Sequence, residues 1–385
     1  MAERVVAQAD VPEVRTSIKD GYAVVASDPK GLRKVIGSST AGSPYLKSVS
    51  AGECVRVSTG AAVPDGADAV VMVEHTLFKP FYCSYHFCCP VLLFLRAHRF
   101  SMPGSDIAKG DLLLDSGCTL GSAEIGVLAG SGKRSVLMYR RPKVCILSTG
   151  NEVSCTAEDV PTGHIRDTNR PQLIALFSSL GFKAIDAGIA VDRLECLREC
   201  LVEAIKVSFR YAHVLVTSGG VSMGEKDLMK DVLMNDFGFK IHFGRVWMKP
   251  GLPTTFATGM VDGERKFVFA LPGNPVSSWV TAQLFAVPLL RKIAGHSRIF
   301  QNVLKVRISQ NLNLDARPEY ARAWLQYGGD IPLAITTGDQ ISSRYIFRSN
   351  SLSGATVLLK LPGKSPQCSV LQAGEIVDAL WLGPN

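Results

Sequence analysis

The sequence predicts a multi-domain α/β protein. Its central domain is a doubly wound, mostly parallel sheet, preceded by a β-rich region and followed by a small all-β domain. Between residues 142 and 297, apolar runs alternate with segments of helical periodicity, a pattern typical of parallel strands covered by helices. On both sides, short apolar runs alternate with Gly, Pro and Asp turn signals, which favours small β-domains. We therefore expect three regions: 1–141, 142–297 and 298–385.

The N-terminal region is predicted to contain short strands and one short helix. Turn signals such as Asp28-Pro-Lys-Gly and Pro64-Asp-Gly separate its apolar runs. Residues 122–130 have a helical composition. We expect Ser122 to be the N-cap of this helix, because a serine hydroxyl accepts a hydrogen bond from a free N–H of the first turn.

The middle region supplies most of the regular elements. Its predicted strands are Lys143–Ser148, Ala184–Ile189, His213–Thr217 and Lys266–Leu271, and its predicted helices are Asn169–Leu180, Leu194–Val207, Lys226–Met234 and one from the Pro272 turn to Ala294. Ligands of doubly wound sheets bind at the carboxyl ends of the strands. Each polar motif of this region falls at such an end. In the last region, strands are expected at Val303–Ile308, Ala355–Pro362 and Glu375–Leu380.

Composition excludes several classes of protein. The formal net charge of +8 is scattered along the chain, which suits anionic small molecules and does not indicate nucleic acid. The most apolar run, Phe87–Leu95, is shorter than the roughly 20 residues of a transmembrane helix, and the first ten residues lack the apolar run of a signal peptide. The ten cysteines show no C-x-x-C spacing. We therefore expect reduced thiols and a cytoplasmic protein.

The most specific motif is Thr217-Ser-Gly-Gly-Val-Ser-Met-Gly-Glu-Lys-Asp227. Its glycines permit a tight turn, and the N–H groups of such a turn at a helix start bind anionic oxygens. Asp227 would then place a carboxylate close to a Mg²⁺ ion bound to a phosphate. The alternative, a plain helix start with a solvated Asp227, is disfavoured by the length of the motif.

Two further loops carry candidate anion-binding groups. Arg245 and Lys249 are four residues apart and flank a turn. They could hold a phosphate and an oxyanion, or be solvated cations on a surface strand. In Leu271-Pro-Gly-Asn-Pro-Val-Ser277, two prolines stiffen the loop, while Asn274 and Ser277 supply polar contacts.

Another strand end carries Glu152, within Ser148-Thr-Gly-Asn-Glu152. Its carboxylate is a candidate acid or metal contact. Asp167 and Asn169 follow, and both residue types cap helices. We expect Asn169 to cap the helix that begins there.

The motifs above, together with Ser17-x-x-Asp20-Gly-Tyr-Ala-Val and Thr59-Gly-Ala, resemble those of the molybdopterin molybdenumtransferases, in the same order. This family includes bacterial MoeA and the E domains of the plant insertase and of animal gephyrin. The resemblance covers nearly the whole chain, including Arg317-Pro-Glu-Tyr and residues 342–350. Residues 241–258 are most similar to the gephyrin-type branch, and Leu252 stands where many other members carry a lysine.

The resemblance implies a molybdenum insertase. Such an enzyme inserts molybdate into adenylated molybdopterin and releases AMP, with Mg²⁺ as cofactor. It also implies that region 1–141 comprises a dimerisation part and an elongated β part, and that region 298–385 is a small β-barrel. The active site would form at a homodimer interface. That interface would explain why Asp20 and Thr59, outside the sheet domain, belong with Asp227.

The resemblance further assigns roles to individual residues. Asp227, with Asp20 and Glu152, would hold Mg²⁺ at the pyrophosphate, and these three are expected to be catalytic together with Lys249. The residues expected to contact the pterin substrate, its phosphates or molybdate are Thr59, Gly219, Gly220, Ser222, Gly224, Arg245, Pro272, Gly273, Asn274, Pro275, Ser277, Arg317 and Arg344. Among them, the Gly219-Gly220 turn and Ser222 would cradle the phosphates. Molybdate would be attracted by Lys249, Ser277, Arg317 and Arg344.

The chain departs from the family at two places. Other members carry a longer N-terminal segment that helps to form the dimer, so the dimer is expected to be weakened or absent. Residues 77–100 do not resemble the family: they hold three of the ten cysteines, six aromatic residues between Phe78 and Phe94, and no Asp or Glu. We interpret this segment as a translated intron or a mis-joined exon. The alternative is a hydrophobic loop that binds a partner.

Three other functions are alternatives to the insertase. Pterin adenylyltransferases resemble the sheet domain, but they typically carry Thr-Thr-Gly-Gly-Thr-Gly and lack the flanking β-domains, so this function is disfavoured. Molybdopterin adenylyltransferase remains a candidate partner. A gephyrin-like scaffold would bind receptor peptides, although its peptide groove includes N-terminal family residues that this chain lacks. The third alternative is an inactive, truncated insertase.

Overall fold

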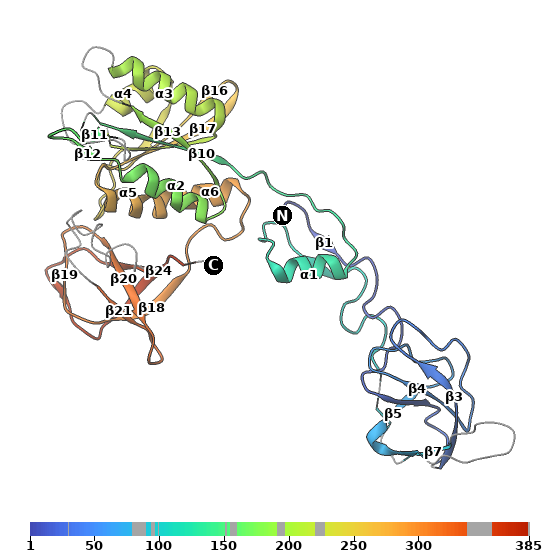
Figure 1. Ribbon diagram of the computed structural model, residues 1–385. Coiled ribbons are helices and arrows are strands. Elements are labelled where there is room, and N and C mark those ends of the chain that lie inside the picture. The colour runs from blue at the N-terminus through green and yellow to red at the C-terminus, as the bar shows by residue number, and fades with distance from the viewer. Residues whose placement is uncertain are drawn as a thin grey trace. The chain divides into compact units, whose positions relative to one another are not determined.

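The computed structural model describes residues 1–29, 31–78, 90–93, 97–98, 100–150, 152–154, 160–190, 197–219, 228–336 and 356–383. The chain divides into two compact units, Met1–Met138 and Tyr139–Asn385. The predicted fold class is confirmed, because the second unit contains an α/β sheet domain and a closed barrel of five strands (Figure 1).

The first unit is β-rich. Its seven-stranded sheet has the order β6-β7-β3-β4-β2-β5-β8, and the strands are β2 (Gly21–Val24), β3 (Leu32–Ser39), β4 (Glu53–Val57), β5 (Ala69–Met72), β6 (Thr76–Phe78), β7 (Pro90–Leu93) and β8 (Ala97–His98). Small side chains such as Ala23, Val55 and Val57 form the core. A separate pair joins β1 (Val5–Val6) to β9 (Leu112–Leu114), and a 3-10 turn covers Val73–His75.

The atypical segment 77–100 is only partly described. Its described residues contribute β7, β8 and the end of β6 to the sheet, and β7 pairs antiparallel with β3. Residues 79–89, 94–96 and 99 lie outside the described residues. The origin of the segment therefore stays a prediction.

The helix predicted at 122–130 is α1 (Ser122–Gly130), but Ser122 is not its N-cap. Gly121 holds that position in an extended conformation, and its N–H donates to the Glu124 carboxylate at 2.8 Å. The prediction was wrong because a glutamate at the third helical position can reach back to the N-cap. The boundary is then satisfied without a serine side chain.

The sheet of the second unit has the order β13-β10-β14-β17-β16-β15. Its strands are β10 (Lys143–Thr149), β13 (Lys183–Ala190), β14 (Val214–Ser218), β15 (Lys240–Phe243), β16 (Thr255–Val261) and β17 (Glu264–Leu271). The first four in that order are parallel, whereas β16 and β15 run antiparallel to their neighbours. Strands β10 and β14 are almost entirely buried, as expected for central parallel strands. A small pair, β11 (Val153–Ser154) and β12 (Ile165–Arg166), follows β10.

Helices cover both faces of this sheet (Figure 1). On one face lie α3 (Leu197–Tyr211) and α4 (Leu228–Asn235), with Leu215 and Phe209 in the shared core. On the other lie α2 (Asn169–Ser179), α5 (Pro275–Thr281) and α6 (Val287–Ile293). The helix predicted to run to Ala294 contains a π segment, Ala282–Ala286. Pro288, which lacks an N–H, follows this segment and accounts for the altered hydrogen bonding.

The C-terminal barrel contains β18 (Val303–Ile308), β20 (Glu319–Gln326), β21 (Leu333–Ile335), β22 (Val357–Leu361) and β24 (Ile376–Trp381). A short pair, β19 (Leu312–Asn313) and β23 (Val370–Leu371), lies beside it. Leu358 packs with Val276 and Val280 of α5, which joins the barrel to the sheet domain.

Two expectations, on membrane-spanning helices and on the state of the cysteines, concern the whole chain and can be compared with its described residues. Within them, no helix has both the length and the hydrophobicity needed to cross a bilayer. Five cysteines in the described ranges are free thiols: Cys54, Cys118, Cys145, Cys200 and Cys368.

A pair of methionines in α4 tests the packing of this helix. Met229 is 1% exposed and Met234 is 47% exposed. Met229→Ala should lower the free energy of unfolding by about 2–5 kcal/mol because it leaves a cavity, whereas Met234→Ala should change it by less than about 0.5 kcal/mol. Urea denaturation of both variants measures the difference. Equal losses would contradict the described orientation of α4.

Candidate functional site

The carboxyl ends of β10, β14 and β17 are joined by a group of hydrogen bonds, which we name the strand-end junction. The Asn169 side-chain amide donates to the Ser218 hydroxyl and, at 2.8 Å, to the carbonyl of Gly273. The Thr149 hydroxyl donates to the Ser218 carbonyl at 3.3 Å. Asn169 at the start of α2 therefore links the last residue of β14 to the loop after β17.

Asn169 does not cap α2, contrary to the prediction. Thr168 is at the N-cap position, and Asn169 is the first helical residue. The N–H of Arg170 donates instead to the Asp167 carboxylate at 3.1 Å, and the Ser148 hydroxyl donates to the same oxygen at 3.0 Å. Because Asp167 accepts the hydrogen bond of the first turn, the Asn169 amide is available for the junction.

One acceptor atom of the junction, Asn169 Oδ1, has no hydrogen-bond donor among the described residues. Asn169 is 8% exposed, and its Oδ1 is buried. A buried polar atom is normally paired, since leaving it unpaired costs about 1–3 kcal/mol. A donor from a bound molecule or from the loop that follows Gly219 would satisfy it.

Position 219 requires a glycine because the neighbouring backbone leaves no room for a Cβ atom. Its φ is +89°, and an added Cβ would lie 2.3 Å from the carbonyl oxygen of Thr149. Its N–H donates to the carbonyl of Leu271 at 3.1 Å. A Cβ on Gly273 would lie 3.6 Å from the Gly219 Cα. The two glycine loops therefore approach each other closely at the junction.

Several predicted site residues lie outside the described residues: Gly220, Ser222, Gly224, Asp227 and Arg344. Their roles stay predictions. In the described part of the chain, no three His, Cys, Asp or Glu side chains are grouped so that they could hold a metal ion.

The loop after β17 begins α5. Asn274 is the N-cap, and its side-chain oxygen accepts from the N–H groups of Val276 at 3.0 Å and Ser277 at 3.2 Å. Pro275 occupies the first helical position, where its missing N–H costs nothing. Pro272 is buried and Gly273 is exposed. The loop is therefore rigid and presents Gly273 at the surface of the junction.

Lys249 belongs to an ion cluster formed with Asp315, Arg317 and Glu319. Its Nζ lies 3.2 Å from Glu319 Oε2 and 3.6 Å from Asp315 Oδ2. The Arg317 guanidinium donates to both Asp315 oxygens, at 3.0 and 3.2 Å. The structure thus brings the predicted cations Lys249 and Arg317 together around one carboxylate.

Asp315 is ionised in this cluster. The hydrogen bonds from the Arg317 side chain and N–H, with the nearby Lys249 charge, lower the pKa of the Asp315 carboxyl to about 2. The same contact raises the pKa of Arg317. With two cations and two carboxylates, the cluster is formally neutral.

Asp20 and Thr59 meet in the first unit. The Asp20 carboxylate accepts from the Thr59 N–H at 2.7 Å and from the Thr59 hydroxyl at 3.3 Å, both on Oδ1. They meet because Asp20 precedes β2 and Thr59 follows β4, and these strands pair antiparallel with Gly21 opposite Val57. Both residues are exposed.

The remaining two predicted residues are exposed. The Glu152 carboxylate lies over Gly150, because a Cβ on that glycine would be 2.7 Å from Glu152 Oε2. Glu152 also anchors the segment before β12 through its carbonyl, which accepts from the N–H of Ile165 at 2.7 Å. Arg245 lies in the connection between β15 and β16 and is exposed.

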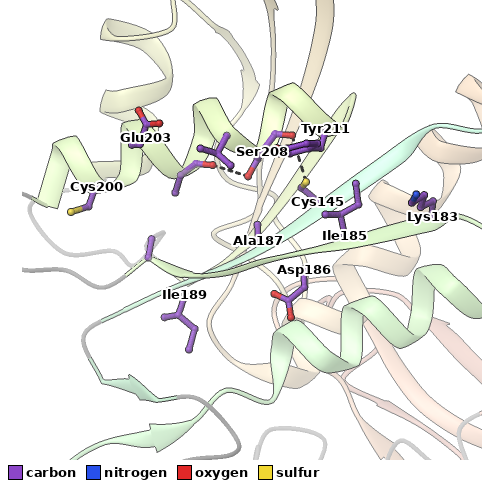
Figure 2. Close-up of a pocket in the computed structure, with 13 residues that line it drawn as sticks. Cys145, Lys183, Ile185, Asp186, Ala187, Ile189, Cys200, Glu203, Ser208 and Tyr211 are labelled. Carbon is purple, nitrogen blue, oxygen red and sulfur yellow. Dashed lines mark hydrogen bonds between the residues drawn. The ribbon is translucent and has the colours of Figure 1, made fainter.

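A pocket of about 880 Å³ lies between β13 and α3 (Figure 2). Its walls include Ile185 and Ile189 from β13 and Val207 from α3, and it contains none of the predicted site residues. Cys145 donates to the Ser208 carbonyl at 3.5 Å, and burial raises the pKa of its thiol to about 11. Burial therefore favours the protonated thiol, and the lining shows that this pocket is not the predicted site.

Comparisons with known proteins agree with the fold. Residues 1–132 match the family model described as the MoeA N-terminal region (domain I and II), and residues 145–292 match the probable molybdopterin binding domain. Two structures of the molybdopterin biosynthesis MoeA protein from Pyrococcus horikoshii superpose with TM-scores of 0.77 and 0.74, at 28% and 24% identity. They cover 100% and 98% of this chain, which in turn covers 91% and 90% of theirs.

Three known proteins are similar to this chain over almost all of its length. The chain is 36% identical to the molybdenum cofactor synthesis protein cinnamon of Drosophila melanogaster, over 98% of this chain and 61% of that protein. It is 35% identical to gephyrin of Dictyostelium discoideum, over 97% and 56%. The chain thus spans less than two thirds of these two relatives. It is 30% identical to molybdopterin molybdenumtransferase of Staphylococcus aureus, over 99% of this chain and 88% of that protein.

The close approach at Gly219 can be tested with a matched glycine. Gly219→Ala should destabilise the sheet domain by more than about 3 kcal/mol, because it adds a clash to the strain of a positive φ. Gly263 has φ +76° with open space around it, so Gly263→Ala should cost only about 1 kcal/mol. Thermal unfolding of the two variants gives the comparison. A similar loss in both would show that the clash at Thr149 is absent.

Proposed function

This chain belongs to the molybdopterin molybdenumtransferase family, and we propose that it inserts molybdate into adenylated molybdopterin with release of AMP. The strand-end junction is the observation that supports this most directly. It lies at the carboxyl ends of parallel strands, where doubly wound sheets bind their ligands. It also carries the unused Asn169 acceptor and the exposed Gly273.

The phosphates of the substrate are proposed to bind directly after β14. Gly219 belongs to the junction, and Gly220–Asp227 follow it in the chain. The N–H groups of the Gly219-Gly220 turn and the Ser222 hydroxyl would bind the anionic oxygens, because successive N–H groups of a tight turn form a concavity that favours anions. The protein then contributes mainly placement and charge stabilisation.

Mg²⁺ is proposed to be held by Asp227 with Asp20 and Glu152. Three carboxylates form a hard oxygen donor set of the kind that Mg²⁺ prefers. The carboxylates of Asp20 and Glu152 are both exposed, and the two hydrogen bonds from Thr59 end on a single Asp20 oxygen. When bound, the ion would neutralise negative charge on the pyrophosphate.

A homodimer is proposed to complete the site. Asp20 and Thr59 belong to the unit Met1–Met138, whereas Glu152 and the strand-end junction belong to the unit Tyr139–Asn385. In the proposed dimer, the first unit of one subunit supplies Asp20 and Thr59 to the sheet domain of its partner. Lys249 and Arg317 would attract the molybdate dianion.

The function can be tested by removing the Asp227 carboxylate. Asp227→Ala should lower AMP release by about 100-fold or more, because the charge that positions Mg²⁺ is lost. The assay supplies adenylated molybdopterin, molybdate and Mg²⁺ to the purified chain. Asp330→Ala, at an exposed bend of the barrel, is the control and should keep wild-type activity. Normal turnover by a folded Asp227→Ala variant would overturn the assignment.

A further inference from the structure

Asp315 stands between the two cations to which molybdate attraction was assigned. Its carboxylate is contacted by the Arg317 guanidinium and by Lys249 Nζ. We propose that Asp315 is an internal competitor of the substrate oxyanion, which must displace this carboxylate to reach Lys249 and Arg317. The proposal rests on the proposed function and identifies a residue that sets the affinity for the oxyanion.

The geometry of the Arg317 contact supports competition. Arg317 Nε donates to Asp315 Oδ1 at 3.0 Å and Nη2 donates to Oδ2 at 3.2 Å. This two-pronged arrangement is the one in which a guanidinium also binds tetrahedral oxyanions. The carboxylate therefore uses the donor pair that molybdate would need.

Lys249 is held in place by its main chain. Its N–H donates to the carbonyl of Pro318 at 2.9 Å, and its carbonyl accepts from the N–H of Tyr320 at 2.8 Å. The lysine backbone is thus fixed to the start of β20, directly beside Arg317. Because the main chain of Lys249 is fixed, only side-chain movements can separate Asp315 from the two cations.

The two carboxylates of the cluster differ in burial. The Glu319 side chain is 7% exposed and the Asp315 side chain is 24% exposed. In the proposed competition, Glu319 stays the counter-ion of Lys249, and the more exposed Asp315 is the group that turns towards water. Once Asp315 has moved, two cations face one carboxylate, and the cluster has a net positive charge that attracts a dianion.

The charge of Asp315 must be separated from its structural role. Asp315 Oδ1 also accepts from the Arg317 N–H at 3.0 Å, which forms a local turn. Asparagine keeps an acceptor at this position and supports the same turn. Asp315→Asn therefore removes the charge while retaining the backbone hydrogen bond.

The test is molybdate binding to the full chain, measured by isothermal titration calorimetry at low ionic strength. Asp315→Asn should bind sodium molybdate about tenfold more tightly than wild type, because one nearby negative charge is gone. The control is Asp378→Asn, which makes the same charge change on the same barrel, where Asp378 pairs with Lys305 at 2.7 Å. It should bind as wild type does. Equal or weaker binding by Asp315→Asn, or equal tightening by the control, would overturn the proposal.

Lys249→Met separates this proposal from the proposed function. If this variant weakens molybdate binding while Asp315→Asn has no effect, the competition is refuted and the assigned role of Lys249 stands. If both variants bind molybdate as wild type does, the ion cluster does not bind molybdate and both assignments fail there. A melting temperature of Asp315→Asn close to that of wild type confirms that the comparison is between folded proteins.

Discussion

The buried amide of Asn169 sets the spacing of the loops at the centre of the sheet. It bonds the Ser218 hydroxyl and the Gly273 carbonyl at once, so the ends of β14 and β17 cannot separate without leaving polar groups unpaired in the interior. Such networks are costly when broken, because the local dielectric is low. The close approach of the loops at Gly219 and Gly273 depends on this constraint.

Much of the fold could be predicted because strands that are buried on both faces consist almost entirely of apolar residues. Strands β10 and β14 are covered on both faces, so they appear as unbroken apolar runs. The polar residues that follow each run then predicted a ligand site at the strand ends. Helix boundaries were less predictable. Ser122 and Asn169 both have capping side chains, but Glu124 and Asp167 satisfy those first turns instead.

The site residues that the sequence reasoning missed act through distant contacts. Asn169 carried a signal: two capping residue types, Asp167 and Asn169, lie at the start of one helix, and only one is needed. Asp315 carried a weaker one, its spacing of two residues from Arg317. Its approach to Lys249 could not be predicted, because that contact depends on how the barrel packs on the sheet domain. Charges far apart in sequence show no periodicity that would pair them.

The main-chain bonds between Lys249 and the residues around β20 have a consequence for the behaviour of the second unit as a whole. They form a backbone bridge between sheet and barrel, and Leu358 adds an apolar contact with α5. Because main-chain and core contacts both join them, we expect the barrel and the sheet domain to open together as one cooperative unit. Local opening of either one would then disturb Lys249, which both hold.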